Sequence, residues 1–275
     1  MSGTSPESRA RTGPRLVIVG AGKMGGAVLQ GAIAAGALER SDVAIFHPNE
    51  RRLAELSERF GVAGVDVAGL HEAEYVLLGT KPQSFATVAP VVATQNAAFI
   101  SLMAGVTLET IARLVGSKRV IRAMPNLGAS LGVGATALAW LPESTSEDVA
   151  LARRLFGAVG RVYDLREELF DAFTGMAGSG PAYVAVVAEA LADGGVRVGL
   201  DRSLARDVAR QLLLASARLL ETKYPSELKD EVSSAGGTAI AGVRTLERHR
   251  LRFALMDAIE EATRRAGELS RQEGK

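Results

Sequence analysis

The chain has 275 residues, of which 47% are hydrophobic and 23% charged, a balance typical of one large globular domain or two smaller ones. Its 32 basic and 31 acidic residues leave a net charge of +1, which gives no electrostatic argument for a nucleic-acid partner. The absence of cysteine excludes disulfides and cysteine-ligated zinc, and three scattered histidines (His47, His71 and His249) argue against a histidine metal site or a Ser-His-Asp triad.

The first residues, MSGTSPESRARTGPR, are polar and lack the apolar core of a secretory signal. No stretch of the sequence approaches the roughly 20 apolar residues that a membrane-spanning helix needs. We therefore expect a disordered tail over residues 1–13, a cytoplasmic location, and neither a membrane nor a nucleic acid as partner.

Short apolar runs alternate with helical patterns through the first half of the chain. Strand, helix, strand at this spacing predicts a parallel sheet with helices on both faces, here over residues 14–165. The expected strands are 16–20, 43–48, 75–82, one that follows a short helix within 90–105, 117–126 and 134–140, and the first two helices are 24–38 and 49–61.

The pattern changes after about residue 165, because residues 169–200 have almost no strand signal. The stretch AYVAVVAEALA at 182–192 is apolar nearly all round, so we expect it to be buried on every side. Its burial is expected either at the centre of its own bundle or against a second subunit. Amphipathic helices are expected at 206–222 and 252–269, which makes 166–275 an all-helical domain.

The turn after the first strand, GAGKMGGAV, has the G-x-G-x-x-G spacing between a strand and a helix. Gly20 permits the tight turn, Gly22 lets the backbone approach a pyrophosphate, and Gly25 lets the helix pack closely. The start of the helix, with Lys23 and Met24, would then face the phosphates. This context predicts a dinucleotide-binding domain of the doubly wound Rossmann type.

The end of the second strand distinguishes NAD from NADP. An NAD-binding protein usually places an acidic residue there for the ribose diol, whereas this chain reads FHPNERR, with His47 at the strand end. Asn49 and Arg51 follow, and they favour a 2′-phosphate and hence NADPH, with NADH as the alternative. Arg52 is expected only to be solvated on the helix face.

Two further turns follow strands at the edge where such a sheet binds its ligand, GTKPQ at 79–83 and RAMPN at 122–126. Each is compatible with a simple strand-ending turn, but several polar turns at one edge favour a cofactor crevice. The remaining candidate cofactor-binding residues are Thr80, Lys81, Pro82, Ala104, Gly105 and Asn126, and no metal-binding residue is predicted.

The segment EVSSAGGTAIAG at 231–242 places hydroxyl and glycine residues ahead of an apolar helical pattern. A row of exposed backbone N–H groups at a helix start suits a small anion. From the residues alone, a serine-capped turn without a ligand explains the segment equally well.

The chain resembles the pyrroline-5-carboxylate reductases, which catalyse the last step of proline synthesis, over nearly its whole length after the tail. The most specific stretches are TGMAGSGPAYV at 174–184, EALADGGVRVGL at 189–200 and ELKDEVSSAGGTAIAG at 227–242, and the others are GAGKMG at 20–25, KPQ at 81–83, SLMAGV at 101–106 and RAMPN at 122–126.

The resemblance implies hydride transfer from NADPH to the C=N carbon of 1-pyrroline-5-carboxylate, giving L-proline. It implies that the helical domain joins two chains in a homodimer, which in many members assembles into a decamer. Glu189 and Asp193 are then expected to cap or pair at the subunit interface. The segment matching VSSAGGTA would hold the substrate carboxylate, and the residues carried over are Ser233, Ser234, Gly236, Gly237, Thr238 and Ala239.

Two positions of this segment depart from the family's pattern. Ala235 stands where the family usually has proline, and Ala239 stands where it has a second threonine, thought to contact the ring nitrogen. Thr238 remains as the candidate catalytic residue, although a shift of one residue at a helix start turns a side chain by about 100°. An alternative hypothesis is that the basic cyclic imine arrives partly protonated and needs no strong general acid.

Two other interpretations compete with this one. A β-hydroxyacid dehydrogenase would share the glycine-rich opening and the helical second half, but its catalytic lysine is missing from GSGPAYVAVVAEALA at 178–192. A nicotinamide-binding scaffold without catalytic activity is favoured by Ala239 and opposed by the intact SSAGGT sequence.

Overall fold

The computed structural model describes residues 13–273, and the expected tail at 1–13 falls almost entirely outside that range. The chain divides into two compact units. The first contains the residues up to Thr174 together with those from Arg264 onward, and the second is Gly175–Thr263. The expected domain boundary between residues 165 and 166 stays a prediction. Within the described residues, no helix is long and apolar enough to cross a membrane.

The first unit is built on one eight-stranded sheet with the order β3-β2-β1-β4-β5-β6-β7-β8. Neighbouring strands are parallel from β3 to β6, as the strand–helix alternation predicts. Every residue of β1, β2, β4 and β5 is buried, as expected for strands covered on both faces. The strands are β1 Leu16–Val19, β2 Val43–Phe46, β3 Ala63–Gly64, β4 Tyr75–Leu78, β5 Ala98–Ser101, β6 Val120–Pro125, β7 Gly134–Trp140 and β8 Gly160–Asp164.

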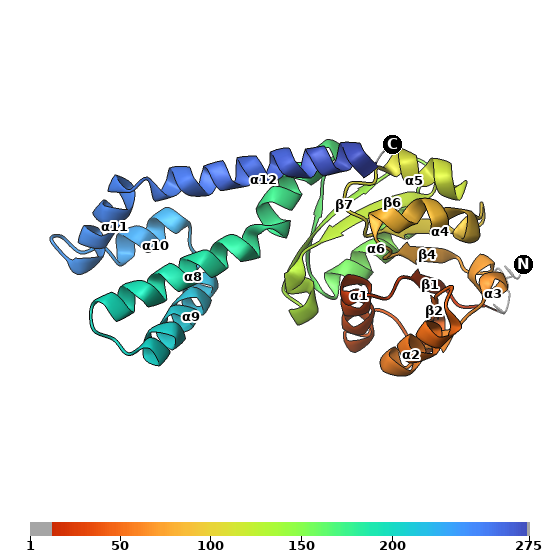
Figure 1. Ribbon diagram of the computed structural model, residues 1–275, viewed down its shortest axis with the longest axis horizontal. Helices are drawn as coiled ribbons and strands as arrows, with labels where there is room; N and C mark the ends of the chain where they lie inside the picture. The colour runs from red at the N-terminus through yellow and green to blue at the C-terminus, as the bar shows by residue number, and fades with distance from the viewer. Residues whose placement is uncertain (1–12, 274–275) are drawn as a thin grey trace, which may run out of the picture. The chain divides into compact units, whose positions relative to one another are not determined.

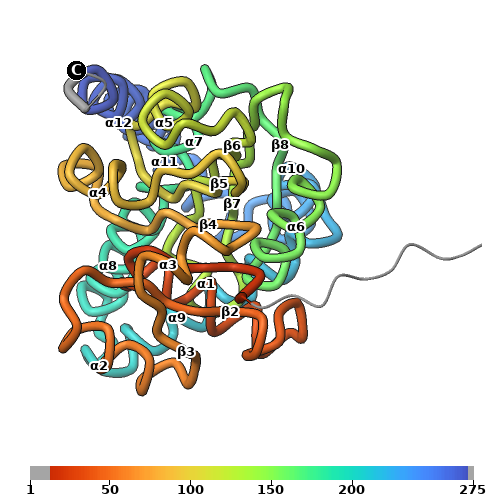
Figure 2. The backbone as a smooth tube through the Cα atoms, turned by 90° about the vertical axis from the view of Figure 1, so that its right-hand side faces the viewer, coloured from red at the N-terminus to blue at the C-terminus, as the bar shows by residue number. Residues whose placement is uncertain are grey.

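Helices cover both faces of this sheet (Figure 1). Buried side chains from α1, α2 and α6 pack on one face, and those from α3, α4, α5 and α7 pack on the other. In Figure 2, strands β4 to β6 run side by side, with α4 and α5 on one side and α6 on the other. The helices are α1 Lys23–Ala34, α2 Glu50–Phe60, α3 Val67–His71, α4 Phe85–Val92, α5 Leu108–Val115, α6 Ser146–Gly157 and α7 Phe170–Phe173.

The far end of the sheet differs from the expectation of a parallel sheet. Strand β7 runs antiparallel to β6, with Pro125 opposite Thr136, and β8 then runs parallel to β7. The reversal is short because Asn126 Oδ1 accepts hydrogen bonds from the N–H groups of Gly128 at 3.2 Å and Ala135 at 3.0 Å. The connection of residues 126–133 is long enough for an antiparallel strand, whereas a parallel strand would need a crossover of a dozen or more residues.

Both outer strands of the sheet are poorly buried, and one of them is very short. Strand β3 has two residues, both exposed. Strand β8 alternates between partly buried and exposed positions, and Arg161 and Asp164 are among its exposed residues. The sequence patterns did not identify β3 or β8 as strands.

Several element boundaries also differ from the expectations. The short helix expected within 90–105 is wrong, because α4 ends at Val92 and residues 93–97 are not helical. The helix expected at 24–38 ends at Ala34, just before Gly36 takes a left-handed φ of 67°. The strand expected at 75–82 ends at Leu78, since a 3₁₀ turn begins at Pro82.

A charged cluster lies beside the N-terminal end of β6, opposite the edge where the parallel strands end. Arg119 donates to both carboxylate oxygens of Asp148, whose side chain is fully buried, and the N–H of Thr145 donates to it at 2.8 Å. Burial raises the pKa of Asp148, but the hydrogen bonds from Arg119 and Thr145 outweigh burial and hold that pKa below its usual value of 3.8.

The second unit is helical, as expected. The π-helical turn Thr174–Gly178 spans the boundary at which this unit begins, and within it a Cβ on Gly175 would lie 2.9 Å from the backbone nitrogen of Thr263. Tyr183 donates its hydroxyl to the carbonyl of Gly175 at 3.1 Å and thereby holds this turn. The helices are α8 Gly180–Arg197, α9 Arg202–Leu219, α10 Pro225–Glu231, α11 Thr238–Arg248 and α12 Leu251–Glu273, of which the last continues into the first unit.

Helix α8 contains the stretch expected to be buried on every side, and within one chain this expectation is wrong. Val184 is 52% exposed and Val186 is 64% exposed, and Ala192 is the buried residue of the helix. Helix α9 likewise exposes Val208 and Leu212. The interpretation that α8 is central to its own bundle is therefore contradicted, and the alternative, burial against a second subunit, stays a prediction.

Candidate functional site

Strands β1, β2, β4, β5 and β6 end at the same edge of the sheet, and β1 lies between β2 and β4. After β1, the chain adds β2 and β3 on one side of β1, and it then crosses over to add β4 on the other side. Such a switch point leaves a crevice beyond the ends of the strands, where open α/β sheets bind their ligands. The candidate cofactor-binding residues follow these strand ends, as the sequence predicts.

The glycine-rich turn lies between β1 and α1. Gly20 has a φ of 86°, and a Cβ on Gly25 would lie 2.9 Å from the Gly20 carbonyl oxygen, so both positions require glycine. A Cβ on Gly22 would meet no atom within 4 Å, so this position opens to free space. Helix α1 starts at Lys23 and Met24, whose N–H groups precede the first intrahelical hydrogen bond and suit a phosphate.

Gly79 is a further glycine at this edge of the sheet that was not assigned to the site from the sequence. A Cβ on Gly79, directly after β4, would lie 2.5 Å from the carbonyl oxygen of Gly20. The turns after β1 and β4 therefore approach each other as backbone against backbone. A glycine that ends the strand next to the glycine-rich turn is the sequence signal that could have identified it.

The segment after β2 is organised by its own hydrogen bonds. The N–H of Asn49 donates to His47 Nδ1 at 3.1 Å, and Asn49 Oδ1 caps α2 by accepting from the N–H of Arg52 at 2.9 Å. The Arg51 side chain is 90% exposed and lies 3.5 Å from Glu55, whereas Arg52 pairs with Glu55 at 2.8 Å. Arg51 is therefore the more loosely held of the two arginines.

The remaining candidate cofactor-binding residues follow β4, β5 and β6. Thr80 donates its hydroxyl to the Met103 sulfur at 3.5 Å, which joins the segments after β4 and β5. Lys81 is exposed and stands directly before Pro82, where a 3₁₀ turn begins. The others are Ala104 and Gly105, which follow β5, and Asn126, which follows β6.

The segment expected to hold a carboxylate lies at the start of α11 in the second unit. Gly236 has a φ of 67°, and Gly237 is the N-cap of the helix. The Ser234 hydroxyl oxygen occupies the space that a Cβ on Gly237 would need, so it lies at the N-terminus of α11. Thr238 and Ala239 are the first two helical residues, and their N–H groups precede the first intrahelical bond.

Ser233 precedes this helix start. Its hydroxyl oxygen is buried and makes no hydrogen bond within the described residues, which is costly unless a ligand or water satisfies it. The six candidate substrate-binding residues lie within the single segment 233–239 of the second unit, whereas all fourteen candidate cofactor-binding residues lie in the first.

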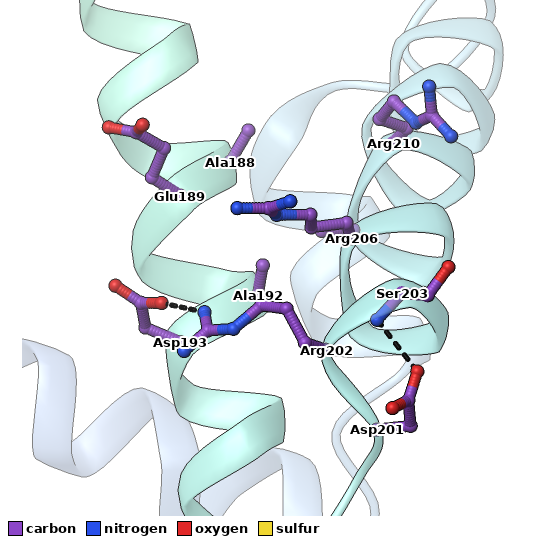
Figure 3. Close-up of a pocket in the computed structure, with 10 residues that line it drawn as sticks. Ala188, Glu189, Ala192, Asp193, Asp201, Arg202, Ser203, Arg206 and Arg210 are labelled. Carbon is purple, nitrogen blue, oxygen red and sulfur yellow. Dashed lines mark hydrogen bonds and ion pairs between the residues drawn. The ribbon is translucent and has the colours of Figure 1, made fainter.

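A groove of about 720 Å³ lies between α8 and α9 in the second unit (Figure 3). Its floor contains Ala188 and Ala192, and its rim carries Arg202, Arg206 and Arg210 from successive turns of α9. Arg202 is paired with Asp193. None of the candidate cofactor-binding or substrate-binding residues lines this groove.

Titratable side chains do not form a metal site in the described part of the chain, where no three His, Asp or Glu residues are grouped to hold an ion. The candidate sites instead offer backbone N–H groups, hydroxyls, amide side chains, the imidazole of His47 and the cationic side chains of Lys23, Lys81 and Arg51. Such groups bind and orient anions and polar ligands.

Comparisons with known proteins cover both units. Residues 167–269 match the family described as pyrroline-5-carboxylate reductase dimerisation, and residues 15–105 match that described as NADP oxidoreductase coenzyme F420-dependent. A pyrroline-5-carboxylate reductase of Thermus thermophilus is 46% identical over 260 residues, which are 94% of this chain and all of that protein.

Solved structures agree with this result. The pyrroline-5-carboxylate reductase of Coxiella burnetii is 29% identical and superposes with a TM-score of 0.85 over 93% of this chain and 98% of that one. The Plasmodium falciparum pyrroline carboxylate reductase, solved with NADP bound, shares the fold with a TM-score of 0.80 at 23% identity, over 94% of this chain and 98% of that one.

Proposed function

The chain belongs to the pyrroline-5-carboxylate reductase family, and from this premise we propose that it reduces 1-pyrroline-5-carboxylate to L-proline with NAD(P)H. The observation that carries the proposal is the 46% identity that extends over the whole length of the Thermus thermophilus relative. The reaction is the last step of proline biosynthesis. Its place in the cell is proposed to be the cytoplasm.

The cofactor site is proposed at the edge of the sheet beyond β1 and β4. Gly20 and Gly25 let the turn and α1 pack tightly, and the free space at Gly22 lets a pyrophosphate approach the backbone. The N–H groups of Lys23 and Met24 would hold its charge. When bound, the nicotinamide cofactor supplies the hydride.

We propose that NADPH is preferred and that Arg51 is the main reason. An exposed guanidinium with one 3.5 Å ion pair is available for a 2′-phosphate. Arg51→Ala is expected to raise KM for NADPH about tenfold and leave KM for NADH nearly unchanged, since a hydrogen bond to a charged group contributes about 1.5–3 kcal/mol. Arg52→Ala is the matched control, because Arg52 is paired with Glu55 at 2.8 Å. Equal effects of the two variants on NADPH would count against this role of Arg51.

The substrate carboxylate is proposed to bind at the start of α11. The Ser234 hydroxyl at the helix mouth and the N–H groups of Thr238 and Ala239 point to an anion, and the buried Ser233 hydroxyl would gain a partner. Held there, the ring of the substrate is positioned for attack at its C=N carbon, and positioning of this kind contributes several kcal/mol to catalysis.

Thr238 is the proposed catalytic residue, as donor of a hydrogen bond to the imine nitrogen. The competing hypothesis is that the substrate arrives protonated. The pH profile of hydride transfer in Thr238→Ala distinguishes the two, because loss of a general acid costs about 100-fold or more. A profile and rate close to those of the unmodified protein would remove Thr238 from that role.

Matching of residues 167–269 to a dimerisation family supports assembly through the helical unit. We propose a homodimer in which a second copy covers the exposed apolar side chains of α8 and α9, with Glu189 and Asp193 among the charged groups at the interface. A decamer built from such dimers is the further proposal that the family resemblance suggests.

The first test mixes the purified protein with 1-pyrroline-5-carboxylate and follows nicotinamide oxidation with NADPH and NADH in parallel. Rapid consumption of either cofactor is the expected result, with NADPH favoured. Binding of both cofactors without consumption would contradict the reductase activity and would favour a scaffold that lacks the hydroxyl missing at Ala239.

A further inference from the structure

The last turns of α12 belong to the first unit, although the helix begins in the second. Ala266, Leu269 and Ser270 from these turns help to line a cavity of about 150 Å³. The opposite wall of this cavity is formed by the segments after β4 and β5, which include Pro82 and the Ala104–Gly105 segment. The end of α12 therefore adjoins segments proposed to hold the cofactor.

Two glycines permit this close approach. Gly105 has a left-handed φ of 78°, and a Cβ there would lie 3.2 Å from the Cα of Ser270. On α12 itself, a Cβ on Gly267 would lie 3.3 Å from Asp171 Oδ2. Glycine is unfavourable inside a helix, so its presence about two turns before the end of α12 fits a need for close contact.

One hydrogen bond fixes the arrangement. Ser270 donates its hydroxyl to Asp171 Oδ1 at 2.9 Å, and both residues are partly buried. Asp171 lies on α7, which packs on the sheet through the fully buried Phe170. The carboxylate thus connects α12 to the core of the first unit, and Ser270 in turn lies against the Gly105 backbone.

We propose that Asp171 and Ser270 are positioning residues for the Ala104–Gly105 segment and so for the bound cofactor. This inference rests on the proposed function, in which Ala104 and Gly105 contact the cofactor. The two side chains act through the backbone of Gly105, against which Ser270 lies. A segment held only by its own left-handed turn would sample other conformations, and ordering it on binding would weaken cofactor affinity.

The test measures cofactor affinity by fluorescence titration of NADPH without substrate, on the full-length protein. Ser270→Ala and Asp171→Ala each remove the hydrogen bond and are expected to raise Kd about fivefold, the equivalent of one ordinary hydrogen bond. Asp171→Asn keeps an oxygen acceptor for the serine and is expected to restore Kd to within about twofold. In turnover, KM for NADPH rises while kcat at saturating NADPH stays nearly constant.

Two further variants separate the possible outcomes. Asp164→Ala removes an ion pair with Arg153 in the same unit and is expected to leave Kd unchanged. Gly22→Val places a side chain into free space at the proposed pyrophosphate site, so it should fold and lose NADPH binding. If Gly22→Val binds normally, the proposed cofactor site itself is wrong. If Gly22→Val fails to bind but Ser270→Ala binds like the unmodified protein, the positioning role is overturned.

Discussion

The two units of the chain bury their apolar side chains in different ways. In the first unit, apolar clusters on both faces of the sheet enclose strands whose residues are wholly buried. In the second unit, the buried cluster consists of Ala192, Ala205 and Ala209, while large side chains such as Phe253 and Met256 are 64% and 68% exposed. The first unit therefore completes its core within one chain, whereas the second leaves large apolar side chains exposed in the single chain, as a surface for assembly would.

The largest expected effect comes from placing a charge on the exposed face of α8. Val186→Asp should abolish the dimer, because a carboxylate buried without a partner costs several kcal/mol. Light scattering during size-exclusion chromatography measures the result as a shift to monomer. Val67→Asp is the matched control, since Val67 is a 42% exposed valine of the first unit and its substitution should leave the assembly intact. A dimeric Val186→Asp variant would contradict the proposed interface.

The next largest effect should come from a substitution that creates a cavity in the core of the first unit. Phe99 on β5 is fully buried, so Phe99→Ala is expected to lower the free energy of unfolding by about 3–5 kcal/mol. Chemical denaturation followed by circular dichroism measures this loss. Leu131→Ala serves as the control, because Leu131 is 81% exposed and its loss should change stability by less than about 0.5 kcal/mol. Similar losses in both variants would mean that the sheet is not the main source of stability.

The ion pair of Arg119 with the buried Asp148 should make the free energy of unfolding depend on pH in the acidic range. Since the pKa of Asp148 is lowered in the folded protein, its contribution is fully present above the ordinary value near 3.8. That contribution is lost as the pH falls through the lowered folded pKa. Asp148→Asn is expected to cost about 2 kcal/mol at neutral pH and to flatten this part of the acid-unfolding curve. An unchanged curve would show that Asp148 carries no such linkage.

The smallest effect is expected at the helix that follows β2. Asn49→Ala removes the cap of α2 and should cost about 1 kcal/mol, whereas Asn49→Ser keeps an acceptor oxygen and should cost only a few tenths. Thermal unfolding of the two variants measures the difference. Equal losses would indicate that Asn49 stabilises α2 by something other than its hydrogen bond to Arg52.

The sequence predicted the parallel part of the sheet well, because each buried strand is a short apolar run followed by a turn with glycine, proline or asparagine. It predicted the glycine-rich turn in its correct place between β1 and α1 for the same reason. It missed β8, whose alternating exposure and charged residues give no apolar run, and β3, which has two residues. The antiparallel β7 depends on the hydrogen bonds of Asn126, which no apolar pattern encodes.

The candidate site was harder to predict at the level of single contacts. Gly79 approaches Gly20 only because β4 lies next to β1 in the folded sheet, a pairing between segments far apart in sequence. The contact of Ser270 with Gly105 joins residues that lie far apart in the sequence, so no local pattern signals it. The roles given to the cofactor and substrate residues stay predictions until the variants above are measured.

The short and charged outer strands of the sheet have a consequence for how the protein avoids aggregation. An edge strand with unpaired backbone groups can serve as a template for strands of other molecules. Here β3 offers two residues and β8 carries Arg161 and Asp164, so both edges are poor templates. The first unit is thus protected against edge-to-edge pairing at both outer strands, even in a chain that is not assembled with others.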